Sequence, residues 1–147
     1  MADFEKCYNT SQKMLATREH GKSEIEKKLI KKGFQIPIIR EVIKELEENN
    51  YLSDERYSYE YIRMRKKKGY GEKKIFFELL NKGVDKKIIQ ENLKDFKDEE
   101  EVLIKAVEKK LNSEYLLDEN KKLKLMRFFS SRGFEEFQVK KILKTYE

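Results

Sequence analysis

Apolar residues and glycines recur along this chain with a spacing of fifty residues. Gly33, Gly83 and Gly133 keep this spacing both times. Six apolar columns hold the same register around them: Ile25/Ile75/Leu125, Leu29/Leu79/Phe129, Phe34/Val84/Phe134, Ile39/Ile89/Val139, Ile43/Leu93/Leu143 and Leu46/Phe96/Tyr146. Seven matched columns indicate an internal repeat, and tetratricopeptide and ankyrin arrays, which repeat every roughly 33–34 residues, do not fit it.

The first repeat shows the local signals of a helical hairpin. Ser23 and Glu26 have the spacing of a capping box, which predicts a helix start there. Gly33 suits the left-handed position that closes a helix, and Phe34 can fold back over the last turn. Pro37 suits the first turn of the next helix, because its missing N–H is not needed there.

The same plan predicts three helices in each repeat, or nine in all. Helices are expected over residues 72–80, 86–96, 121–131 and 136–146, with preceding helices near 4–19, 54–68 and 99–112. Asp85 is the expected cap of one of them. Lys121 stands where the other repeats have Gly21 and Gly71, so the turn before that helix is expected to differ. The sequence predicts an all-α fold, a continuous array of three three-helix repeats over residues 1–50, 51–100 and 101–147, elongated and curved.

Composition supports helices and narrows the class of protein. Of the 147 residues, 42% are charged and 38% apolar, with one proline and six glycines, which leaves few turn residues for a strand-rich fold. No apolar run is long enough to span a membrane. The first residues lack the apolar stretch of a signal peptide. Because Cys7 is the single cysteine, we expect no disulfide and a reducing cytoplasm.

Candidate catalytic residues are few. His20 is the only histidine, which excludes a histidine pair for a metal site and leaves it in an expected solvated loop. Cys7 is interpreted as a small buried core residue. The segment 69–71 lacks the ending of a phosphate loop. Glu24 and Lys28 are spaced as a surface ion pair. We therefore expect no enzyme, no cofactor and no metal.

Charge is concentrated in one segment. The chain has a net charge of +6, and residues 56–74 alone hold eight basic and two acidic residues. Tyrosines are interleaved with them: Tyr57 and Tyr61 have the spacing of a buried stripe, whereas Tyr59 and Tyr70 are expected to be exposed. Residues 121–134 add five basic residues and no acid. Such blocks can meet phosphates or another protein, although a solvated lysine-rich face is the plain alternative.

These motifs together resemble the RecX family of regulatory proteins. The resemblance rests on Arg18-Glu-His-Gly-Lys-Ser-Glu-Ile25, Leu29 and Gly33-Phe34, then Tyr51-Leu-Ser-Asp-Glu-Arg-Tyr57, Tyr61-Ile62, Arg65, Lys68-Gly-Tyr-Gly71, Ile75, Glu78-Leu79 and Lys82-Gly-Val84. It is close over residues 14–96 and depends on the glycine register and apolar columns beyond residue 100. Ser53 and Tyr57 depart from the family's usual Asp and Phe.

The resemblance implies a non-enzymatic regulator that lies in the groove of the RecA recombinase filament on single-stranded DNA. We expect the protein itself to be a monomer. It would mostly inhibit ATP hydrolysis, strand exchange and co-protease activity in DNA repair. Direct contact with single-stranded DNA is open, and a stand-alone helical nucleic-acid-binding module is the alternative. The expected contacts are Arg63, Arg65, Lys66, Lys67, Lys68, Tyr70, Lys73 and Lys74, with a second patch of Lys121, Lys122, Lys124 and Arg127.

Overall fold

The described part of the chain is entirely helical. The computed structural model describes residues 2–111 and 117–146, which contain nine α-helices, one short 3-10 helix and no strand. The helices are α1 (Ala2–Thr17), α2 (Lys22–Lys31), α3 (Ile36–Glu48), α4 (Asp54–Lys67), α5 (Glu72–Asn81), α6 (Lys86–Lys94), α7 (Glu99–Leu111), α8 (Glu119–Ser131) and α9 (Glu136–Leu143), followed by η1 (Lys144–Tyr146). The predicted helical fold and helix order are confirmed. Residue 112, the expected end of the seventh helix, lies outside the described residues.

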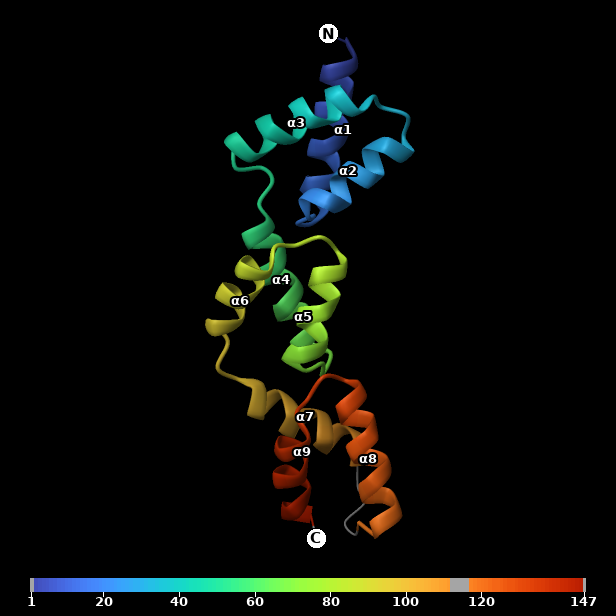
Figure 1. Cartoon of the computed structure of the whole chain (residues 1–147), viewed down its shortest axis with the longest axis vertical. Coiled ribbons are helices and arrows are strands. Elements are labelled where there is room, and N and C mark those ends of the chain that lie inside the picture. Colours follow the sequence, from blue (N-terminus) through green and yellow to red (C-terminus); the bar gives the residue numbers. More distant parts are fainter. Residues whose placement is uncertain (1, 112–116, 147) are drawn as a thin grey trace. The chain divides into compact units, whose positions relative to one another are not determined.

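The chain divides into two compact units, the first formed by residues 1–60 and 79–92. In this unit α3 packs against α1 and α2 (Figure 1). Its core contains Cys7 of α1, Ile25 and Leu29 of α2, and an apolar stripe of α3 that includes Ile39 and Leu46. The prediction that Cys7 is a buried core residue is confirmed, and burial raises the pKa of its thiol.

The second compact unit contains residues 61–78 and 93–147. Its core joins α7, α8 and α9 through nine buried apolar side chains, which are Leu103, Val107, Leu111, Leu125, Phe129, Phe134, Val139, Ile142 and Leu143. Five of these, Leu125, Phe129, Phe134, Val139 and Leu143, belong to the fifty-residue columns, so the apolar register of the sequence marks inward-facing positions of this unit. Figure 1 shows α9 beside α8, and these two helices also pack against each other through their side chains.

The three repeat glycines close their helices as expected. Gly33, Gly83 and Gly133 have φ values of 93°, 84° and 96°, the left-handed region where glycine is least strained. After each glycine the next N–H donates to a carbonyl five residues back, as from Phe34 to Leu29 at 3.2 Å. The glycine N–H itself donates to a carbonyl three residues back, as from Gly33 to Ile30 at 3.0 Å. Together these two hydrogen bonds form a Schellman motif.

Helix starts agree with the sequence in two places and differ in one. Asp85 accepts a hydrogen bond from the Lys87 N–H at 2.8 Å, which confirms the expected cap of α6. Pro37 lies in the first turn of α3, also as expected. The capping box at Ser23 and Glu26 is wrong, because α2 already begins at Lys22.

One tertiary contact and one local side-chain hydrogen bond explain the earlier start of α2. The Asp54 carboxylate accepts from the Lys22 N–H at 2.8 Å, and Glu24 accepts from the Gly21 N–H at 3.3 Å. In the third repeat α8 starts at Glu119, with Asp118 accepting from the Lys121 N–H at 2.8 Å. The helix thus begins three residues earlier in the register than α2 or α5, which confirms that this repeat differs where Lys121 replaces glycine.

Candidate functional site

The predicted basic segment spans the end of α4, the following turn and the start of α5. Lys67 and Lys68 are exposed, and within the described residues neither makes an ion pair. Lys73 is also exposed, whereas Arg63 and Lys74 are half-buried. The Lys74 ammonium lies 5.3 Å from the Tyr70 ring centre.

Lys66 is not the exposed cation that the sequence predicts. Its side chain is 3% exposed, and its ammonium contacts Glu72 at 3.0 Å, Asp98 at 2.8 Å and Glu99 at 3.2 Å. Burial alone would lower the pKa of Lys66, but hydrogen bonds to Asp98 and Glu72 and the charge of Glu99 raise it above its ordinary value. Lys66 therefore joins α4, α5 and α7, and its charge is neutralised within the chain.

Arg65 is also engaged within the second unit. Its guanidinium binds the Glu78 carboxylate through two hydrogen bonds of 2.9 and 2.7 Å, and Tyr61 donates to the same carboxylate at 2.9 Å. Burial opposes ionisation of Glu78, but these two donors hold the pKa of the carboxyl below its usual range. A bidentate arginine pair of this kind fixes the orientation of both side chains.

Tyr70 is half-buried, which corrects the expectation of an exposed ring. The guanidinium carbon of Arg65 lies 3.6 Å from its ring centre and that of Arg132 lies 4.5 Å away. Cation–π contacts hold these groups together. Of the other tyrosines, Tyr57 is buried and Tyr59 is exposed as expected, while Tyr61 is only partly buried.

The second predicted patch lies on α8. Lys121, Lys124 and Arg127 are exposed and Lys122 is half-buried. None of these four residues lines the groove described next, so the structure does not bring the two predicted patches together in one site.

A groove in the second unit contains basic residues that the sequence prediction missed. It is a cavity of about 670 Å³ lined by α4, α7, α8 and the adjoining turns. Beside the predicted Arg63, Lys66, Lys67 and Lys68, it is lined by four basic residues that were not predicted, which are Lys105, Lys109, Lys110 and Arg132. We call this cavity the basic groove. The four-residue spacing of Lys105 and Lys109 places both on one face of α7 and could have predicted this basic surface. The three acidic residues in the first turn of that helix obscured the pattern, because they lower its net charge.

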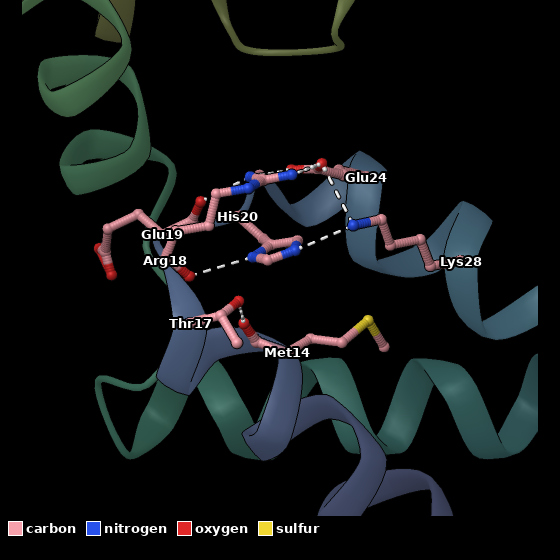
Figure 2. Close-up of polar contacts among 8 residues, drawn as sticks. Met14, Thr17, Arg18, Glu19, His20, Glu24 and Lys28 are labelled. Atoms are coloured by element: carbon pink, nitrogen blue, oxygen red, sulfur yellow. Dashed lines mark hydrogen bonds and ion pairs between the residues drawn. The ribbon is translucent and has the colours of Figure 1, made fainter. Parts of the chain in front are cut away.

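His20 is buried, so the prediction of a solvated loop is wrong. Figure 2 shows its ring between Arg18 and Lys28. Its Nδ1 lies 3.0 Å from the Arg18 carbonyl oxygen and its Nε2 lies 3.0 Å from the Lys28 ammonium. This geometry requires a neutral ring whose Nδ1 donates and whose Nε2 accepts. Desolvation is the main cause of the lowered pKa of His20, with the charges of Arg18 and Lys28 adding to it.

The Glu24–Lys28 pair is part of this same contact and not an isolated surface pair. Glu24 contacts Lys28 at 3.6 Å and also binds the Arg18 guanidinium (Figure 2). Although burial acts in the opposite direction, the hydrogen bond from Arg18 and the nearby positive charges lower the pKa of Glu24 to about 2. The contacts among Arg18, His20, Glu24 and Lys28 therefore connect the end of α1 to α2.

Metal sites and membrane-spanning helices are two further classes of feature to consider. Among residues 2–111 and 117–146, no group of His, Cys, Asp and Glu side chains is arranged to hold a metal ion. None of the helices in the described part of the chain has the length and apolarity needed to cross a membrane.

The helical fold with glycine-closed three-helix groups and a basic groove defines an all-α repeat protein with a cationic groove. Comparison with known proteins identifies the family, and the chain belongs to the RecX family. The family's first three-helix domain matches residues 7–46 and its second matches residues 53–93.

Similar proteins extend the match over most of the chain. Regulatory protein RecX of Pelodictyon phaeoclathratiforme is 40% identical, over 90% of this chain and 83% of the relative. Regulatory protein RecX of Legionella pneumophila (strain Corby) is 34% identical, over 95% and 93% of the two chains. The crystal structure of RecX from Lactobacillus salivarius has the same fold, with a TM-score of 0.82, 23% identity, and coverage of 99% and 97%.

Proposed function

We propose that this protein binds RecA recombinase filaments on single-stranded DNA and modulates, mostly by inhibition, their ATPase, strand-exchange and co-protease activities. It would act in the cytoplasm during DNA repair and the SOS response, by binding and not by catalysis. Membership of a family whose members are named regulatory proteins carries the proposal. The exposed cations at the end of α4 support it, because a filament on DNA is a long anionic target.

The structure changes which predicted contacts are the best candidates. Lys67, Lys68 and Lys73 are exposed. Lys66 and Arg65, by contrast, are bound by carboxylates of their own unit. We therefore assign partner contact to the exposed group and a structural role to Lys66 and Arg65. The exposed residues of the α8 patch, Lys124 and Arg127 among them, remain proposed secondary contacts.

The test is RecA ATPase on single-stranded DNA, titrated with this protein at two salt concentrations. We expect inhibition below the protein concentration that coats naked DNA, and weaker inhibition at higher salt, since exposed charges are screened. Binding of the protein to naked DNA is measured alongside. Inhibition only at DNA-saturating concentrations would instead support a stand-alone nucleic-acid-binding module.

A matched pair of variants tests the surface. Lys67→Gln/Lys68→Gln removes two charges before Gly69, and Lys31→Gln/Lys32→Gln removes two charges before Gly33, at an equivalent left-handed turn. We expect the first variant to inhibit several-fold less than the wild type and the second to inhibit normally. Equal inhibition by both variants would exclude this surface as the contact.

A further inference from the structure

The basic groove has a strong excess of positive charge. Eight basic and two acidic side chains line it. One of the acids, Asp98, is already bound by Lys66 at 2.8 Å. Glu101 therefore remains as the one groove carboxylate in the described residues without a cation at ion-pair distance. A concave site with this imbalance concentrates field lines and attracts anions.

The cations come from two helices. Lys67 and Lys68 lie at the end of α4, and Lys105 and Lys109 lie one turn apart on α7. All four side chains are exposed, and the described residues provide none of them with an ion pair. Their charges are thus hydrated in the free protein and available to neutralise an anion that enters the groove.

The Phe128 ring, which lines the groove, is covered by two cations. The Lys110 ammonium lies 4.3 Å from the centre of the Phe128 ring, and the Arg132 guanidinium carbon lies 4.7 Å from it. Phe128 also packs edge-to-face on Phe129, with ring centres 5.0 Å apart. Because these cations occupy the face of the Phe128 ring, the ring is not available for stacking a nucleic-acid base, and an entering ligand meets positive charge there.

We propose that the basic groove binds the sugar–phosphate backbone of a single nucleic-acid strand without sequence preference. The inference deepens the proposed function and rests on it for the identity of the strand, which in the filament is single-stranded DNA. Lysine ammonium groups are flexible point charges that neutralise phosphates in many orientations. The strand's phosphates would replace the water around Lys67, Lys68, Lys105 and Lys109 and release counterions.

Two other anions fit less well. An acidic protein segment is best recognised by the planar fork of arginine. Of the two arginines that line the groove, Arg132 is stacked on Tyr70 and Phe128, and Arg63 already interacts with another group of the chain. A duplex carries its phosphates on a convex surface, so it would reach the rim of a concave groove and not its interior. A flexible single strand can follow the groove.

The experiment measures fluorescence anisotropy of a labelled oligothymidylate of about 20 nucleotides at about 50 and 200 mM salt. The wild type is compared with Lys105→Gln/Lys109→Gln. We expect the variant to bind several-fold more weakly, and its log affinity to fall less steeply with log salt by about 1.4, since each phosphate contact on a single strand contributes about 0.7.

Lys27→Gln/Lys31→Gln is the matched control, because it removes an exposed lysine pair with the same four-residue spacing from α2. The control should bind as the wild type does. Lys67→Gln/Lys68→Gln tests the groove from α4 and should show the same loss as the α7 variant, which keeps the test valid if one variant folds poorly. Equal losses in the control and groove variants would overturn the proposal, as would absence of oligothymidylate binding by the wild type.

Two further probes distinguish the ligand classes. If polyglutamate competes with the oligothymidylate at the same concentration of charge, the ligand is an acidic protein segment and the proposal is overturned. Equally tight binding of a duplex would exclude the assignment to a single strand. The RecA ATPase assay separates this inference from the proposed function. Inhibition retained by Lys105→Gln/Lys109→Gln without strand binding by any form would leave the regulator intact and overturn the groove assignment. Strand binding through the groove without an effect on RecA would support the groove assignment and overturn the proposed regulatory function.

Discussion

At the scale of single residues, burial determines what Lys66 and His20 do. Lys66 is enclosed by three carboxylates, of which Asp98 and Glu99 lie more than thirty positions along the chain. His20 is held neutral between a carbonyl oxygen and an ammonium group. Each group is stabilised only by these particular partners, so a change at either position tests the structure directly.

Replacing Lys66 by Met should destabilise the protein although it removes a charge from a lysine-rich chain. The change leaves Glu72, Asp98 and Glu99 facing one another without their cation. A fully buried pair that loses one partner costs about 3–5 kcal/mol. Because Asp98 and Glu72 are partly exposed, we expect a loss of about 2 kcal/mol in the free energy of unfolding, by the same reasoning.

Urea unfolding followed by circular dichroism measures this loss, and Lys67→Met is the control, since Lys67 is exposed and neighbours Lys66 in sequence. Lys67→Met should change the free energy of unfolding by less than about 0.5 kcal/mol, as is usual for surface positions. Similar unfolding midpoints for the two variants would contradict the enclosed position of Lys66.

His20 should make the stability of the first unit depend on pH. Its pKa in the folded protein is lowered from 6.5, so between 6.5 and that lower value the unfolded chain binds more protons than the folded one. Stability is therefore complete above pH 6.5 and falls as pH decreases through this window. The groups facing His20 are the Arg18 carbonyl, the Lys28 ammonium and the Glu24 carboxylate.

The measurement is the urea midpoint of the wild type and of His20→Gln from about pH 7 to 5.5, which lies around the ordinary histidine pKa. Glutamine cannot gain a proton, so the variant should lose less stability than the wild type over this range. Parallel curves for the two proteins would show that His20 does not titrate differently in the folded and unfolded states.

At the scale of elements, glycine turns and helix caps define where helices end. The left-handed turns at Gly33, Gly83 and Gly133 follow from the sequence, because a helix end with this conformation favours glycine. The start of α2 at Lys22 does not, because Asp54 from α4 accepts the hydrogen bond from the Lys22 N–H. A cap from a distant helix has no local signal.

Gly133 and Gly33 should differ in their tolerance of alanine although their φ values are 96° and 93°. A Cβ on Gly133 would lie 2.5 Å from the Lys74 backbone nitrogen, whereas nothing lies within 4 Å of a Cβ on Gly33. Gly33→Ala should cost only the strain of the left-handed conformation, about 1 kcal/mol. Gly133→Ala should cost a further 1–3 kcal/mol, roughly, for the overpacked contact.

Thermal and urea unfolding of the two variants compare these costs. The expected order is wild type, then Gly33→Ala, then Gly133→Ala. Equal destabilisation by the two changes would mean that the approach of Lys74 to the turn adds nothing, and that conformational strain alone distinguishes these glycines from alanine.

At the scale of the whole molecule, the chain contains two compact units, each with its own apolar contacts. The matched family domains, residues 7–46 and 53–93, lie within the first two of the three repeats predicted from the glycine spacing. Division into three repeats stays a prediction, since along the chain the boundaries of the two compact units fall inside α4, α5 and α6 and not between the predicted repeats. The proposed regulatory function belongs to this scale, because a filament presents many protomers to one chain.

The helices, the inward-facing columns, the glycine-closed turns and the family could all be predicted from the amino-acid sequence, since each depends on local conformation or on spacing along the chain. Which cations are available depends on the folded structure. Lys66 and Lys67 are neighbours with the same side chain, yet one is enclosed by carboxylates and the other is exposed. Burial and pairing depend on residues that are distant in sequence, such as Asp98 and Glu99, and these meet Lys66 only after the second unit has folded.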